Sequence, residues 1–172
     1  MRRFEGTSDG RVEAQLDPDE VTLLQSLAGQ VAELVAGIST SSTSVDGSTN
    51  SDAAVARLLP DAYPDDAEAS SEFRRFTQSG LADRKVANAE TVIRSLGRAD
   101  ITGSVALDEP ETLSWLRCLT DIRLTIASRL GIETEDDEAG RTIDPLMREL
   151  YDWLGFVQNS LIEAVDDRST DG

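Results

Sequence analysis

The segment from Asp108 to Gly131 constrains the fold more than any other part of the chain. Its apolar side chains recur every three or four residues and so share one face of a helix: Trp115, Cys118, Leu119, Ile122, Ile126 and Leu130. Further leucines widen this face: Leu113, Leu116 and Leu124. A helix that is apolar on more than one side is typical of a bundle centre. We therefore expect a mainly α-helical bundle around a long central helix at about 108–131.

Both ends of this central helix carry clear signals. Asp108 is the expected N-cap, Pro110 is tolerated in the first turn, and Glu111 stands three residues after the cap. Gly131 can adopt the left-handed conformation that ends a helix. Similar signals and apolar periodicity predict further helices over about 17–38, 52–59, 65–76, 81–96 and 145–165.

Residues 2–16 have the pattern of a β-hairpin. Charged and apolar side chains alternate, and Asp9-Gly10 is a strong turn signal between the two halves. An isolated hairpin is only marginally stable, so we expect it to pack on helices or to join another strand. Residues 104–107, just before the central helix, are the candidate third strand.

The chain length fits a single domain over residues 1–172. Residues 39–51 are almost entirely Ser, Thr and other polar residues, which predicts a mobile loop. The polar end of the chain, residues 166–172, is expected to fray.

The charge balance limits the classes of partner. Lys and Arg total 16 against 33 Asp and Glu, which gives a net charge of −17. Such an excess disfavours direct contact with nucleic acid and with anionic lipid, and it favours a basic protein partner or simply solubility. No apolar run is long enough for a membrane span and no secretory signal is evident, so we expect a cytoplasmic protein.

The residue types argue against catalysis. The chain has no histidine, one cysteine and no glycine-rich phosphate loop, so we expect no enzyme activity, no metal site and no cofactor. The acidic segment 133–138 lacks the spacing of a calcium loop and is more typical of a solvated charge run. A possible partner surface combines this segment with a basic pair: Arg74, Arg75, Glu133, Glu135, Asp136 and Asp137.

Two further features have a functional and a structural interpretation. Cys118 lies near Arg117 and Arg123, and a nearby cation lowers a thiol pKa, which would make a redox thiol. Its position in the apolar stripe equally fits a core residue. The aromatic residues Trp115, Tyr151, Trp153 and Phe156 form either a pocket between two helices or part of the core.

Four segments together resemble a family of small actinobacterial proteins of otherwise unknown function that includes AosR-like oxidative-stress regulators. They are MRRFEGTSDGRVEAQLDPDEVTLL, RLLPDAYPDDAEASSEFRRFT, LDEPETLSWLRCLTDIRLTIASRLGI and YDWLGFVQNSLIEAV. The resemblance implies a cytoplasmic, non-enzymatic regulator that acts with a sigma factor of RNA polymerase. It also implies a switch in which thiols oxidise to an internal disulfide, which this chain cannot form because Cys118 is its only cysteine.

The sequence therefore supports two functional hypotheses. The first is a regulatory interaction protein in the oxidative-stress transcriptional response, which binds a protein partner such as a sigma factor. The alternative is a small-ligand-binding or accessory domain of a metabolic enzyme system, which uses an aromatic pocket between helices. Direct DNA binding ranks below both, because no recognition helix with a basic exposed face is evident.

Overall fold

The chain folds into a mainly α-helical structure with a small antiparallel sheet, as the sequence predicts. The computed structural model describes residues 1–41, 53–59, 67–99, 103–130 and 144–170, with the backbone alone at 38–41, 53, 55–56, 67–79 and 168–170. The elements in chain order are β1 (Glu5–Gly6), β2 (Val12–Gln15), α1 (Pro18–Ser41), α2 (Ala53–Leu58), α3 (Ala67–Leu96), β3 (Ser104–Leu107), α4 (Glu109–Leu130) and α5 (Pro145–Thr170).

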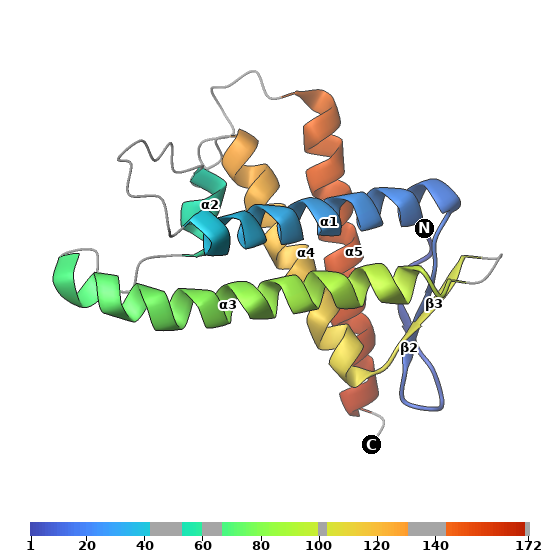
Figure 1. Ribbon diagram of the computed structural model, residues 1–172. Helices are drawn as coiled ribbons and strands as arrows, with labels where there is room; N and C mark the ends of the chain where they lie inside the picture. Colours follow the sequence, from blue (N-terminus) through green and yellow to red (C-terminus); the bar gives the residue numbers. More distant parts are fainter. Residues whose placement is uncertain (42–52, 60–66, 100–102, 131–143, 171–172) are drawn as a thin grey trace.

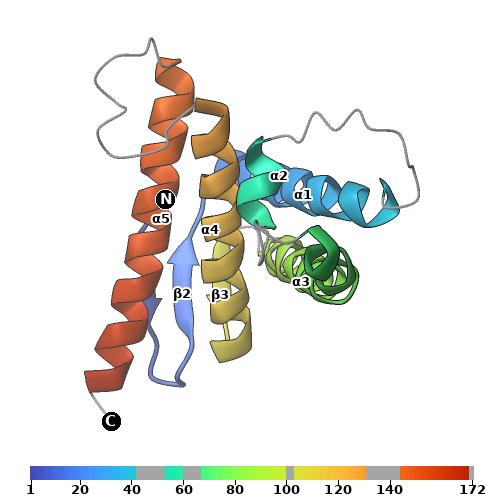
Figure 2. The same cartoon turned by 90° about the vertical axis from the view of Figure 1, so that its left-hand side faces the viewer.

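The helices form two crossing pairs. Helices α1 and α3 lie side by side, and α4 and α5 lie together across them (Figure 1). The short α2 packs on α4, and the sheet lies beside α5 and the α3–α4 junction (Figure 2). Among the described elements, α4 contacts every other helix, which confirms its predicted central position.

The predicted start signal of α4 is present in full. The Glu111 amide donates to Asp108 Oδ1 at 2.9 Å, and the Asp108 amide donates back to Glu111 Oε2 at 3.2 Å. This reciprocal pair satisfies amides that the helix itself leaves unbonded. The predicted stripe is buried from Trp115 to Ile126, whereas Leu113 is 45% exposed and does not belong to it.

One prediction about the helices is wrong. The sequence suggests separate helices over 65–76 and 81–96, but α3 is continuous from Ala67 to Leu96 and passes through Gly80. Glycine in a helix costs only about 1 kcal/mol relative to alanine, and the long contact with α1 offsets that cost. Glycine alone therefore does not end this helix.

Two helices also extend into segments that their polar composition suggests are irregular. Helix α1 continues through Ser41, three residues into the predicted loop 39–51; the rest of that loop lies outside the described residues. Helix α5 continues to Thr170, so it includes most of the segment 166–172, whose fraying stays a prediction. Local composition misplaced both boundaries because helices carry polar residues at their ends as readily as loops do.

The predicted hairpin and its third strand are confirmed. The strand order is β1-β2-β3, and both pairs are antiparallel. Gly10 has φ of +81° in the turn, where its amide donates to the Thr7 carbonyl at 3.0 Å. At the other end of β2, the Leu16 amide donates to the Gly103 carbonyl at 2.9 Å, which fixes the start of β3.

Trp115 joins the sheet to the helices. Its ring meets Phe4 edge to face with centroids 5.7 Å apart, and its Nε1 donates to the buried Ser95 Oγ at 2.8 Å. A buried indole normally needs such an acceptor. Residues from the hairpin, α3 and α4 therefore share one core.

Candidate functional site

A buried ion pair lies between α3 and α4. Lys85 is the only lysine of the chain, and its Nζ donates to Asp121 Oδ1 while the two side chains are 15% and 5% exposed. Burial raises the pKa of Asp121, and the hydrogen bond and charge of Lys85 act against that rise. The pair therefore compensates charge inside the helix interface.

Cys118 lies one helical turn before Asp121 and is buried. The pKa of its thiol is raised to about 12, mainly by burial and also by the Asp121 carboxylate, while Lys85 acts against the rise. The cation that lowers this pKa is Lys85 and not either arginine that the sequence suggests. These surroundings disfavour the thiolate, which is the reactive form, so they favour the core interpretation.

Cys118 is accordingly expected to react slowly in the folded protein. A colourless disulfide reagent that releases a chromophore should modify the thiol at least about a hundredfold faster in denaturant than in native buffer. The denatured sample serves as the control for a free thiol. Equal rates in the two samples would contradict the buried placement.

The four aromatic residues do not form one pocket. Trp115 is in the core and Trp153 is half-buried, whereas Tyr151 and the exposed Phe156 line a pocket of about 410 Å³. Arg123 from α4 also lines this pocket. The pocket is thus aromatic on one side only. It also contains the guanidinium of Arg123, which the sequence suggests as a neighbour of the Cys118 thiol.

Arg123 is held by two contacts, and one of its partners is fixed by a third. Its guanidinium carbon lies 4.7 Å from the centroid of the Tyr151 ring, and Nη1 donates to Gln158 Oε1 at 2.8 Å. Gln158 in turn donates from Nε2 to Thr120 Oγ1 at 2.8 Å. The Nε of Arg123 is buried and has no hydrogen-bond partner. The guanidinium is therefore fixed in place with part of its donor capacity unused.

A larger groove of about 670 Å³ lies between the hairpin and the C-terminal half of α5. Three carboxylates line it, Glu5, Glu163 and Asp167, against one guanidinium, that of Arg3. Arg3 and Glu163 form an exposed ion pair at 3.5 Å. Glu5 and Asp167 remain as negative charges, so the groove is acidic. We call it the hairpin groove.

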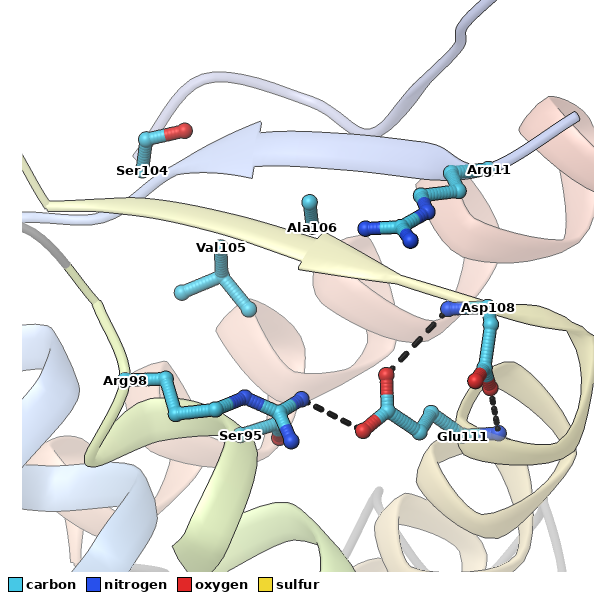
Figure 3. Close-up of a pocket in the computed structure, with 8 residues that line it drawn as sticks. All are labelled: Arg11, Ser95, Arg98, Ser104, Val105, Ala106, Asp108 and Glu111. Carbon is cyan, nitrogen blue, oxygen red and sulfur yellow. Dashed lines mark hydrogen bonds and ion pairs between the residues drawn. The ribbon is translucent and has the colours of Figure 1, made fainter. Parts of the chain in front are cut away.

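A third hollow, of about 400 Å³, lies between β3 and the junction of α3 and α4 (Figure 3). Its charged side chains are already matched: Arg98 pairs with Glu111, which also receives the Asp108 amide, and Arg11 pairs with Asp9 at 3.6 Å. A ligand would have to displace these contacts. We therefore assign no site there.

The predicted partner surface lies largely outside what the structure describes. Glu133, Glu135, Asp136 and Asp137 are outside the described residues, and Arg74 and Arg75 belong to α3 with their side chains outside them. Sequence reasoning missed the groove residues Glu5 and Asp167 because they come from opposite ends of the chain.

Within the described residues, no group of three or more His, Cys, Asp or Glu could hold a metal. No helix in the same residues is long and apolar enough to span a membrane.

Comparison with known proteins gives one match. A family model described as a domain of unknown function, DUF2017, matches residues 1–165. Neither a curated protein nor a solved structure matches the chain. Because the model covers nearly the whole chain, this protein belongs to the DUF2017 family.

Proposed function

We propose that this protein is a non-enzymatic regulator that binds a basic, extended segment of a partner protein in the hairpin groove. The observation that carries the proposal is the acidic character of that groove, which is the largest of the hollows described above. Opposite charge on the partner would speed encounter and select against acidic competitors.

The backbone of β1 supports an extended occupant. The Thr7 amide donates to the Arg11 carbonyl at 2.9 Å. Bonded and non-bonded residue pairs alternate along an antiparallel ladder, so the preceding residue, Gly6, makes no backbone hydrogen bond to its partner Val12. Its amide and carbonyl consequently point away from β2, on the side where α5 and the groove lie. An extended segment can bond such groups while its side chains meet the carboxylates.

The charges of the sheet also point to a role beyond folding. Glu5 lies directly opposite Glu13 in the β1–β2 pair, and both side chains are exposed. Like charges at such positions destabilise a sheet by a fraction of a kcal/mol. A carboxylate at Glu5 therefore does not help the hairpin fold, but it would attract a cationic segment.

The choice of partner rests on the resemblance to the AosR-like oxidative-stress regulators. On that basis we propose a sigma factor of RNA polymerase as partner and the cytoplasmic transcriptional response to oxidative stress as context. The burial of Cys118 argues that oxidation is sensed elsewhere than at this thiol, for example by the partner.

Reversing the two uncompensated groove charges is expected to weaken partner binding. For the double variant Glu5→Lys/Asp167→Lys we expect an affinity for a purified sigma factor at least about tenfold lower than for the native chain, measured by titration calorimetry. Raising the salt concentration should weaken binding by the native chain and so reduce the difference in affinity between the native chain and the double variant.

A matched control is available on α1 and α5. Glu33→Lys/Glu149→Lys makes the same change in net charge at exposed positions that do not line the groove. It should bind nearly as tightly as the native chain. Equal losses in both double variants would contradict the groove, and no binding of any sigma factor would contradict the proposed partner.

The alternative function, a small-ligand or accessory domain, is favoured by a separate observation. The pocket beside Tyr151 and Phe156 contains a charged group without a carboxylate partner among the described residues, and this group is the basis of the next inference.

A further inference from the structure

The pocket at Arg123 contains a cation that no carboxylate pairs among the described residues, although the whole chain carries a net charge of −17. Two carboxylates line it, and each already has its own arginine: Asp152 pairs with Arg148 at 3.3 Å, and Glu163 pairs with Arg3 at 3.5 Å. Arg123 has no such partner within the described residues; its contacts there are Gln158 and the Tyr151 ring. The two arginines and two carboxylates that line the pocket balance in number, but Arg123 is the lining charge without an oppositely charged partner among the described residues.

The guanidinium is also accessible at one edge. Gly155 of α5 lines the pocket, and a Cβ built on it would lie 3.6 Å from Nη2 and 3.7 Å from Cζ of Arg123. Any side chain longer than alanine at this position would therefore cover that edge of the guanidinium. The absence of a side chain at residue 155 leaves Nη2 open toward the pocket.

The walls around this cation are rigid and partly aromatic. Tyr151, Gly155 and Phe156 lie on α5, Arg123 lies on α4, and the Gln158–Thr120 hydrogen bond ties the two helices together at the same level. Phe156 is 42% exposed although it is a large apolar side chain. A fixed donor beside an exposed ring offers a polar anchor and an apolar contact for one small molecule.

We propose that Arg123 anchors a binding site for a small monocarboxylate with a planar, apolar body. The carboxylate would accept from Nη2, and the body would lie against Phe156. Arginine suits this role because its planar set of donors matches a carboxylate. One negative charge would pair with this guanidinium, whereas a dianion would add an unpaired negative charge beside Asp152 and Glu163.

This inference does not depend on the docking of a basic segment. The pocket and the hairpin groove share the Arg3–Glu163 pair as a common wall, but Arg123 and Tyr151 line the pocket only, and Glu5 and Asp167 line the groove only. Variants at one site therefore test it without changing the charges that define the other.

Fluorine NMR of para-fluorobenzoate at millimolar concentration tests the site directly, because it reports binding without relying on protein stability. We expect the probe signal to broaden with the native protein and the affinity to fall at least about tenfold in Arg123→Met. Para-fluorobenzamide, which has the same shape and no charge, should not broaden. Arg117→Met removes an exposed arginine from the same helix and should behave as the native chain does.

A second variant covers the case in which Arg123→Met fails to fold. Gly155→Leu keeps the guanidinium, improves helix propensity, and places a side chain over its open edge, so it should also abolish broadening. Equal broadening by the amide, unchanged binding in either variant, or no broadening with the native protein would each overturn the proposal. None of these results bears on sigma-factor affinity, which remains the test of the hairpin groove.

Discussion

Replacing Lys85 with methionine is expected to lower the free energy of unfolding by about 3 kcal/mol at neutral pH, which is one of the two largest effects that the structure predicts. Methionine keeps the length of the side chain but leaves the Asp121 carboxylate, 5% exposed, without its cation. Leaving one buried charge without its partner destabilises the fold by far more than the intact ion pair stabilises it. Urea denaturation monitored by circular dichroism measures the difference.

The loss of stability caused by Lys85→Met should depend on pH in a defined direction. Burial raises the folded-state pKa of Asp121, so the folded protein holds this proton more tightly than the unfolded chain does, and stability falls as pH rises from the unfolded pKa through the folded one. Without Lys85, the interaction that opposes this rise in the Asp121 pKa is lost. The fall in stability therefore extends to higher pH. Lys85→Met should therefore lose less stability at about pH 5 than at about pH 7.

Two comparisons separate charge from packing. Arg84→Met removes an exposed cation next to Lys85 and should change stability by no more than about 0.5 kcal/mol. Lys85→Met/Asp121→Asn removes the buried charge together with its partner and should recover a large part of the loss. A penalty that is independent of pH, or no recovery in the double variant, would show that the ion pair is not what Lys85 contributes.

Gly103→Ala is expected to destabilise the fold by a similar amount, about 3 kcal/mol. Gly103 has φ of +76°, and a Cβ there would lie 1.9 Å from the Leu16 carbonyl oxygen, which is backbone and cannot rotate away. The strand ends would have to separate and lose the hydrogen bond from the Leu16 amide to the Gly103 carbonyl. Thermal unfolding and amide hydrogen exchange in β2 and β3 measure this loss.

Gly10→Ala provides the matched control for that substitution. Gly10 has nearly the same φ, +81°, but nothing lies within 4 Å of its built Cβ. Alanine there should cost only the conformational strain, about 1 kcal/mol. Equal effects at the two glycines would mean that β2 and β3 do not approach as closely as the structure shows.

The sequence predicts the elements whose signals are local. The apolar stripe around Trp115 and Ile122 is visible because its period matches a helix, and the Asp9-Gly10 turn is visible because few residues adopt positive φ. The continuity of α3 through Gly80 was not predictable in the same way. A glycine can end a helix or lie within it, and contact with α1, which is far away in the sequence, decides between the two.

The candidate sites depend almost entirely on long-range contacts. Lys85 and Asp121 are 36 positions apart, and nothing near either residue indicates its partner. Arg123 was visible as a cation near Cys118, but only the packing of α5 places it over Tyr151. The hairpin groove combines residues from the two ends of the chain. Periodicity therefore predicts the scaffold, whereas tertiary packing determines which charges are matched and which remain available.

The most direct test of the proposed function compares the affinities of the two charge-reversed double variants for the same purified sigma factor. Both carry the same net charge, so only position distinguishes them. If the segment lies in the hairpin groove, Glu5→Lys/Asp167→Lys binds at least about tenfold more weakly than Glu33→Lys/Glu149→Lys. Indistinguishable dissociation constants at low salt would show that the protein attracts its partner through overall charge and not through this groove.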